Sequence, residues 1–333
     1  MLRSSVAFAL LACAVACGGS SGSNSNTIPD SKLDPAAGAP QAEPAPPTEP
    51  APPAEPAPPP PPAEPVTMVL PAPKTTVKLL SPGKGARAPL RVAPTASSKQ
   101  QVELIMDATI EQAPVGQQPQ TVTMPTVVLS GTGEATAVAA DGASTYHTVI
   151  DAVDARDRAN QSIPPAALKT QISSLLGMTV DGTVTAAGGV GETTYRIEKP
   201  EHTTAGALES LKLMLPTWVP LPAVPVGVGA RWEVTEESEI NGIATTHVTT
   251  YKLVSRNKDG ATISGETKVT GANQTLQGVE VSEISGSGHV DAVFAPGALY
   301  PKLTSTVSTK VRLKQGTEDL TIDMRLGSAF LPK

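Results

Sequence analysis

The chain has 333 residues, of which only 3% are aromatic, and its formal net charge is −6. Residues 1–17 carry +1 and residues 18–74 carry −4, so the remainder, residues 75–333, carries −3. A segment this close to neutral does not attract nucleic acid electrostatically, and so few aromatic side chains argue against base stacking. The composition therefore excludes a nucleic-acid-binding protein, and we expect no nucleic acid partner.

The first residues have the pattern of an export signal. Arg3 supplies a positive charge, and Ser4 to Ala16 form an apolar, alanine-rich stretch that is too short to span a bilayer. The chain has two cysteines, Cys13 and Cys17, and both lie at the end of this stretch. We predict a signal peptide over residues 1–16 and an exported protein.

The sequences LLAC at 10–13 and AVAC at 14–17 resemble the lipobox of bacterial lipoproteins. This resemblance implies that a cysteine acquires lipid and that the chain is cleaved just before it. We predict lipidation at Cys17, because the flexible polar sequence GGSSGSNSN follows it directly, and hence a contact with the membrane through that lipid. Gly18 stands where some inner-membrane relatives have aspartate, which favours the outer membrane.

Two alternatives to lipidation at Cys17 stay open. Modification at Cys13 would agree with Leu10, which lies three residues before it as the lipobox expects, whereas Cys17 has Ala14 at that position. Ordinary secretion would follow cleavage at Ala14-Val15-Ala16, which is itself an A-x-A sequence.

Residues 17–74 are predicted to be a disordered spacer, rich first in Gly and Ser and then in Pro and Glu. The hexads AEPAPP at 42–47, TEPAPP at 48–53 and AEPAPP at 54–59 repeat along it. Proline fixes φ and lacks an amide donor, so neither helix nor sheet is expected. About 40 residues of polyproline II helix would extend roughly 120 Å, enough to hold a domain away from the membrane.

Past residue 74 the pattern becomes that of β-strands. In QVELIMDATI, residues 101–110, Val102, Leu104, Met106, Ala108 and Ile110 fall on one face. Hairpin turns are predicted at Asp141-Gly142, Asn241-Gly242 and Asp259-Gly260, because both loop positions of such a turn favour positive φ, and a last hairpin is predicted around KQGT, 314–317.

A two-residue loop at Asn241-Gly242 also fixes the register of its two strands. The predicted pairs are Trp232 with Tyr251, Val234 with Thr249, Glu236 with His247, and Ile240 with Ile243, all on one face. We expect this hairpin to be central to the core, and its aromatic pair to add about 0.5–1 kcal/mol beyond the burial of its area.

Two short helices are expected between the strands. The first lies in 162–177, with Ser162 as its N-cap, prolines in its first turn, Gly177 at its end and an apolar stripe that includes Leu176. The second lies in 203–216 and ends at Pro216. Together with the hairpins they predict a mainly β domain over 75–333, an antiparallel curved sheet or half-barrel with the two helices packed on one face.

The segment PTWVPLPAVPVGVGARW, 216–232, is an apolar strap with repeated prolines. It resembles a motif of uncharacterised envelope lipoproteins of Gram-negative bacteria, in which a leucine-rich helix and a proline turn precede a V-G-x-G-x-x-W strand, here Val226, Gly227, Gly229 and Trp232. The sequence SGSGHVDAVF, 285–294, also looks like that family. The resemblance implies an antiparallel β-rich envelope domain with no established activity.

No catalytic or cofactor motif occurs in the context that it requires, so we expect no enzyme, no cofactor and no metal. Gly18 to Gly22 fit G-x-S-x-G but lie in the tether, and Ser81 to Lys84 fit S-x-x-K but contain Pro-Gly. The histidines are scattered. Two weaker alternatives are a calcium site on an outer strand face and a basic surface for anionic lipid or polysaccharide. The first would use Glu233, Glu237 and Glu239, and the second Lys78, Lys84, Arg87, Arg91 and Lys99.

These observations predict a non-enzymatic, lipid-anchored envelope protein. Its β-domain, held away from the membrane by the spacer, would bind a lipid or another apolar ligand. An architectural or adhesive surface protein and a hydrolase with an unrecognised site are the alternatives, and protein partners are left open.

Overall fold

The computed structural model describes residues 64–201, 204–212, 218–240 and 242–333. Residues 1–63, which contain the predicted signal peptide, both cysteines and most of the spacer, lie outside the described residues.

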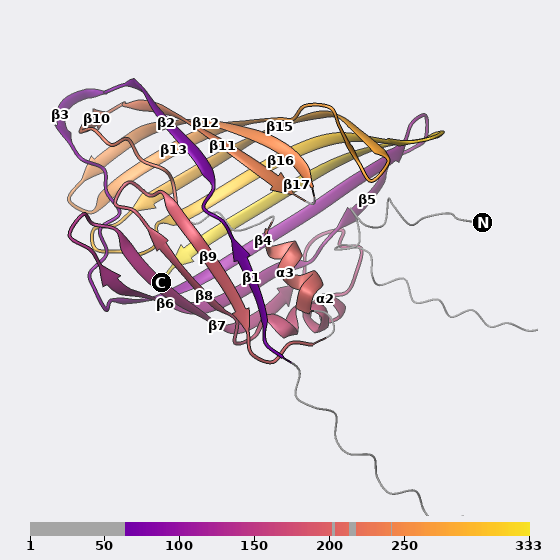
Figure 1. Cartoon of the computed structure of the whole chain (residues 1–333), viewed down its shortest axis with the longest axis horizontal. Coiled ribbons are helices and arrows are strands. Elements are labelled where there is room, and N and C mark those ends of the chain that lie inside the picture. The colour runs from indigo at the N-terminus through magenta and orange to yellow at the C-terminus, as the bar shows by residue number, and fades with distance from the viewer. Residues whose placement is uncertain (1–63, 202–203, 213–217, 241) are drawn as a thin grey trace, which may run out of the picture. The chain divides into compact units, whose positions relative to one another are not determined.

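A single large antiparallel sheet dominates the described part of the chain and confirms the mainly β prediction (Figure 1). The 15-stranded sheet contains β1 (Val66–Leu70), β2 (Lys74–Ser81), β4 (Lys99–Pro114), β5 (Gln120–Thr123), β6 (Thr126–Val138), β7 (Ser144–Arg156), β8 (Thr179–Val184), β9 (Val190–Ile197), β11 (Arg231–Ile240), β12 (Ile243–Asn257), β13 (Gly260–Thr270), β14 (Gln274–Leu276), β15 (Val279–Phe294), β16 (Lys302–Gln315) and β17 (Glu318–Pro332). Strands β3 (Lys84–Ala88) and β10 (Val226–Val228) form a separate pair, and the helices are α2 (Pro165–Ile172) and α3 (Thr204–Lys212).

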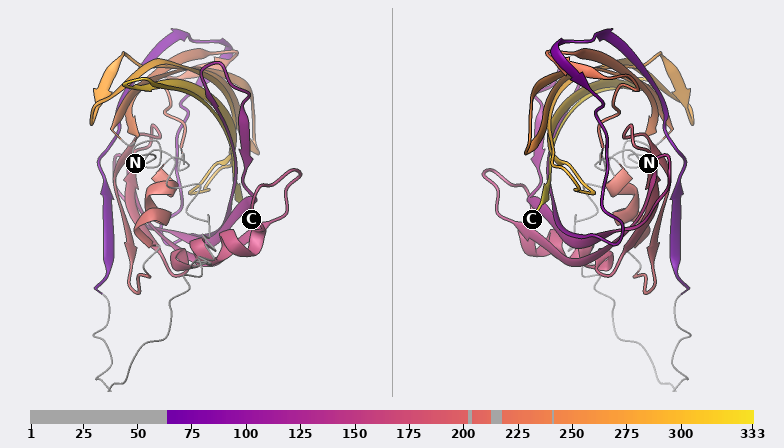
Figure 2. Two further views of the ribbon diagram at one scale, coloured as in Figure 1. Left: turned by 90° about the vertical axis from the view of Figure 1, so that its right-hand side faces the viewer. Right: turned by 90° about the vertical axis from the view of Figure 1, so that its left-hand side faces the viewer.

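The two edges of the large sheet are strands that follow one another in the chain. The order is β1-β9-β8-β7-β6-β4-β17-β16-β15-β13-β12-β11-β2, with β5 and β14 branching off this path. If the sheet were flat, its edges would lie about 58 Å apart at ~4.8 Å per strand. Yet Leu70 at the end of β1 is joined to Lys74 at the start of β2 by residues 71–73, which span about 14 Å at most. The sheet must therefore curl, as Figure 2 shows, and it has an inner and an outer face.

The folded part begins earlier than the predicted boundary at residue 75. β1 pairs with β9 from Val66 opposite Ile197 to Leu70 opposite Thr193, so residues 66–70, and Lys74 at the start of β2, belong to the sheet and not to the spacer. The sequence VTMVL has the alternation and the β-branched residues of a strand. Its flanking prolines, Pro65 and Pro71, are compatible with an edge strand, because an edge does not need every amide donor.

The inner face carries the main core. The face predicted for β4 is confirmed: Val102, Leu104, Met106 and Ala108 are buried, and Ile110 is half-buried. Opposed residues share a face, so one apolar row crosses six strands from Leu104. The row consists of Leu104, Phe330, Leu303, Ala292, Ile263 and Leu253, all buried.

The predicted register of the β11–β12 hairpin is confirmed at all four pairs. Trp232 is fully buried, its ring stacks on Tyr251 with centroids 5.6 Å apart, and its Nε1 donates a hydrogen bond to the carbonyl oxygen of Pro220 at 2.9 Å. The hairpin is therefore fixed to the strap as well as to its neighbouring strands.

The described part of the strap packs inside the curved sheet. Trp218, Val219 and Leu221 are buried, and Trp218 stacks on Tyr300 with centroids 5.1 Å apart. The glycines of the V-G-x-G sequence allow this path. A Cβ on Gly227 would lie 2.2 Å from the carbonyl oxygen of Lys84, and Gly229 has φ +81°.

Two of the predicted turns are displaced. Val138 pairs with Ser144, so Asp141-Gly142 lies in a loop over 139–143 rather than forming a two-residue turn. Asn257 pairs with Gly260, which places the turn at 258–259, one residue before the prediction. In both cases the cross-strand partners, and not the Asp-Gly dipeptide, determine where the strand ends. The last hairpin turns at Gly316-Thr317, as KQGT predicts.

The predicted N-cap of the first helix is wrong. Helix α2 begins after Pro164 and has no side-chain cap, with proline in its first turn as expected. Ser162 instead bonds to Thr123: its Oγ accepts a hydrogen bond from the Thr123 amide at 3.0 Å, and its own amide donates to the Thr123 carbonyl. Leu168, Ile172 and Leu175 are buried as predicted, whereas Leu176 is 58% exposed because the helix ends before it.

We predict that Trp232→Ala lowers the free energy of unfolding by about 3–5 kcal/mol, because it removes a fully buried indole together with its stacking and hydrogen bond. Urea denaturation followed by circular dichroism measures this loss. Glu233→Ala, one residue along on the outer face, is the matched control and should change stability by less than about 1 kcal/mol. Similar losses in the two variants would contradict the assignment of faces.

Candidate functional site

On the inner face, many side chains beyond the Trp232–Tyr251 pair are only half-buried. Two further rows cross the sheet from β4 to β11. The first consists of Ala108, Leu326, Val307, Gly288, Thr267, Thr249 and Val234, and the second of Ile110, Met324, Thr309, Gly286, Val269, His247 and Glu236. Ile110 is half-buried and packs against a second apolar cluster. We call the other half-buried side chains of these rows the inner band: Leu326, Val307, Thr267, Met324, Thr309, His247 and Glu236.

The inner band lies between two packed cores. On one side is the main core, which includes Met106, Trp232 and Tyr251. On the other side is a second apolar cluster made by Val279, Val281, Ile284, Leu313 and Ile322. No member of the inner band belongs to either cluster. Apolar side chains such as Leu326 and Val307 thus face inward yet keep contact with solvent.

Glu236 and His247 are the groups of the inner band that ionise near physiological pH, and they lie directly opposite each other. Burial raises the pKa of the Glu236 carboxyl above its ordinary value and lowers the pKa of the His247 imidazole. An ion pair would have shifted both pKa values in the other direction. Among the described residues Glu236 has no hydrogen-bond or ion-pair partner, and His247 contacts only the hydroxyl of Thr245, at 3.2 Å.

The other polar groups of the band are hydroxyls. Thr267 and Thr249 bond to each other across β13 and β12 at 2.8 Å, and Thr309 lies opposite Gly286. Burial raises the pKa of the Tyr251 hydroxyl, and the nearby carboxylate of Glu236 raises it further. The inner band therefore combines apolar walls, several hydroxyls and one acid–base pair.

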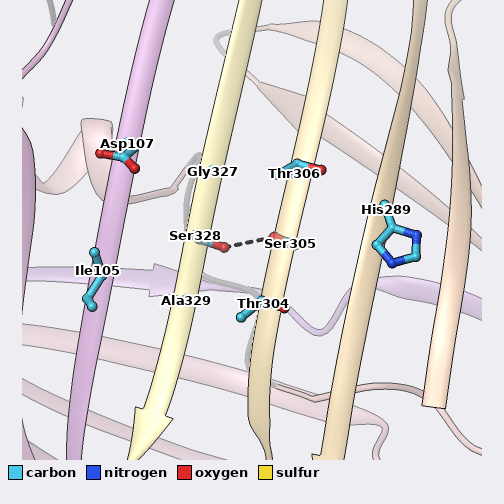
Figure 3. A pocket seen from close by; sticks show the side chains of 9 residues that line it. All are labelled: Ile105, Asp107, His289, Thr304, Ser305, Thr306, Gly327, Ser328 and Ala329. Atoms are coloured by element: carbon cyan, nitrogen blue, oxygen red, sulfur yellow. Dashed lines mark hydrogen bonds between the residues drawn. The ribbon is translucent and has the colours of Figure 1, made fainter. Parts of the chain in front are cut away.

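A separate depression of about 250 Å³ lies over β4, β17, β16 and β15 (Figure 3). Its floor is low because Gly327 and Ala329 have little or no side chain. Strand alternation places His289, Thr306 and Asp107 on the outer face of the sheet, so the depression opens on that face. Ser305 and Ser328 point inward, and their hydroxyls are bonded at 2.8 Å.

His289 is held at this outer depression by two carboxylates. Its Nδ1 lies 2.8 Å from Glu266 and its Nε2 lies 3.0 Å from Asp291, and these contacts raise its pKa. Both ring nitrogens are thereby occupied, so His289 lacks the free nitrogen that a general base or a metal ligand needs.

The structure disperses the residues weighed as site candidates. Glu233, Glu237 and Glu239 lie on the outer face of β11, away from Trp232, and Glu237 pairs with Lys74 at 3.5 Å. The basic residues lie on β2, β3, β4 and the segment between β3 and β4, with Lys99 paired to Glu134 at 3.4 Å. Cys17, the predicted lipidation site, lies outside the described residues, as do Cys13 and His202.

The described residues show neither a metal-binding cluster nor a membrane-spanning helix. No group of three or more His, Cys, Asp or Glu side chains is placed to hold a metal ion there. Nor does that part of the chain contain a helix with the length and apolar character needed to cross a membrane.

The inner band was not recognised in the sequence, although part of its signal was present. The hairpin register already placed Glu236 opposite His247 on the face of Trp232, and a charged pair on an apolar face is unusual. The members on β16 and β17 could not be joined to them, because they are 60 or more residues away in the chain and their pairing is a tertiary property.

Comparisons with known proteins add little. No known protein family matches the sequence, and no curated protein does. Among solved structures, one similar chain is in-vitro folded OmpT, an outer membrane protein of Vibrio cholerae in its trimer form. The two share 9% identity with a TM-score of 0.15, over 71% of this chain and 100% of that one.

Two histidines of this sheet should titrate on opposite sides of the ordinary value of 6.5. We expect the pKa of His289 above it, because two carboxylates favour its charged form, and that of His247 below it, because burial disfavours it. Imidazole NMR titration, assigned with His289→Gln and His247→Gln, measures both values. Titration in the reverse order would contradict the description of the two environments.

The two histidines also affect stability with opposite signs. The contribution of His289 is fully present below pH 6.5 and is lost as pH rises through its raised folded pKa. For His247, stability is lost as pH falls below 6.5 toward its lowered folded pKa, because the unfolded chain then binds the proton better. Urea denaturation of both variants across this pH range checks the signs.

Proposed function

We propose that this chain is a lipid-anchored protein of the bacterial envelope whose β-domain binds an amphiphilic lipid on its inner face, without catalysing a reaction. The observation that carries the proposal is the inner band, where apolar side chains face inward but remain half-buried between two packed cores. Apolar side chains that face inward and stay solvated leave apolar surface for a ligand to cover, which supports a ligand site.

The chemistry of the inner band favours an amphiphile over a purely apolar molecule. Leu326, Val307 and Met324 offer apolar contact on β17 and β16, whereas Glu236 and His247 on β11 and β12 offer polar contact. A ligand with its chain along the first group and its head at the second would satisfy both. The predicted outer-membrane location and the lipidation of Cys17 are part of the same proposal and rest on the N-terminal sequence.

Binding is tested with the full chain carrying Cys17→Ser, which avoids detergent, and the neutral fluorophore N-phenyl-naphthylamine. Val307→Trp should weaken binding at least about tenfold. The side chain of Val307 is already half-buried in the inner band, so the larger indole would occupy the space that the ligand needs. Thr306→Trp, the neighbouring residue on the outer face, is the matched control and should bind as the parent does. Mass spectrometry of the protein purified from cells should find retained lipid. Equal binding by both tryptophan variants would contradict the proposed site.

Anchoring is tested separately by fractionation of the envelope. Cys17→Ser should move the exported protein from the membrane fraction to the soluble fraction, because one cysteine carries the whole anchor in this proposal. Cys13→Ser should leave it in the membrane, since that residue would be removed with the signal peptide. Release by Cys13→Ser alone would assign the anchor to Cys13, and membrane retention of both variants would contradict lipid anchoring.

A further inference from the structure

We infer that the Glu236–His247 pair is the head-group site of the inner band and that it selects amphiphiles with an amine head over those with a carboxylate head. The inference rests on the proposed function and adds the chemical class of the ligand.

The two side chains lie side by side. Glu236 and His247 form a directly opposed pair of the β11–β12 hairpin on the inner face. Antiparallel partners have Cβ atoms about 5 Å apart, so one small polar group can contact both side chains. Thr75 of β2 and Val269 of β13 are their neighbours across the sheet, and neither side chain carries a charge.

The inner face around the pair carries few charged side chains. In the rows of the inner face that begin at Leu104, Met106, Ala108 and Ile110, Glu236 is the one carboxylate and no lysine or arginine is present. While His247 is neutral, which its lowered pKa favours, the face carries either the negative charge of Glu236 or no charge. An ammonium group would gain a charge-assisted hydrogen bond there, whereas a second carboxylate would be repelled.

Glu236 also lacks a partner. Its half-buried side chain is partly removed from water, which raises its pKa, and no described residue pairs with it. A carboxylate in this position gains more from an incoming donor than one that is already paired. Glu237, the next residue, shows the contrast: it lies on the outer face and already pairs with Lys74 at 3.5 Å.

The test compares three amphiphiles with the same chain: dodecylamine, dodecanol and dodecanoate, each below its micelle concentration and at mildly alkaline pH. Displacement of N-phenyl-naphthylamine from the full-length Cys17→Ser protein gives the three affinities. Dodecylamine should displace the probe at a concentration about tenfold lower than dodecanoate, the difference typical of one charge-assisted hydrogen bond, with dodecanol between them.

Two variants assign this preference to the pair. Glu236→Gln should reduce the preference for the amine at least about fivefold while the affinity for dodecanol changes less than about twofold, because the amide keeps the shape but lacks the charge. Glu237→Gln, the matched control on the outer face, should leave all three affinities unchanged. Dodecylamine should also shift the imidazole NMR signals of His247 and not those of His289, which requires no variant.

The outcomes separate the two proposals. Equal affinities for the three amphiphiles, or an amine preference that survives Glu236→Gln, would overturn the head-group site while lipid binding stands. Displacement by none of the three, together with unaltered probe fluorescence in Val307→Trp, would overturn the proposed function itself.

Discussion

The fold depends on one short covalent link, residues 71–73 between β1 and β2. These strands are the two edges of a path of 13 strands, counted without β5 and β14, and the link holds the edges within about 14 Å. The sheet has to curl to satisfy it. Pro71 and Pro73 narrow the conformations of the link without loss of a ladder bond, since both lie at sheet edges. Curling then divides every strand into an inner and an outer set of side chains.

Curvature also explains why a polar pair is found inside. On a flat sheet, the face of Trp232 would be solvated around Glu236 and His247, and neither group would be deprived of water. In the curled sheet the same face turns inward, and the pKa values of both groups shift as burial requires. The outer face keeps the ion pairs, such as Lys74 with Glu237 and His289 with its two carboxylates, in contact with water where they destabilise nothing.

Predictions from the sequence held where the determinant was local and failed where it was not. The register from Trp232–Tyr251 to Ile240–Ile243 follows from one Asn-Gly turn, and the inward face of β4 follows from alternation. The sequence predicts that Ser162 caps a helix, but strand β5 offers the amide and carbonyl of Thr123, so Ser162 bonds to Thr123 instead. The sequence does not reveal that the folded part starts at Val66, because prolines flank β1. A strand flanked in this way is tolerated at the edge of a sheet, and the edge position of β1 is a tertiary property.

The sequence by itself determined much of the local geometry: strands from period-two alternation and hairpins from turn residues. Tertiary structure alone decided that β4 lies beside β17, more than 200 residues later, that the first two strands form opposite edges, and that the inner band is left half-buried between two cores. The physical reason is that alternation assigns a residue to a face of its own strand only. Which strands become neighbours, and whether side chains from across the curve cover that face, depends on non-local packing.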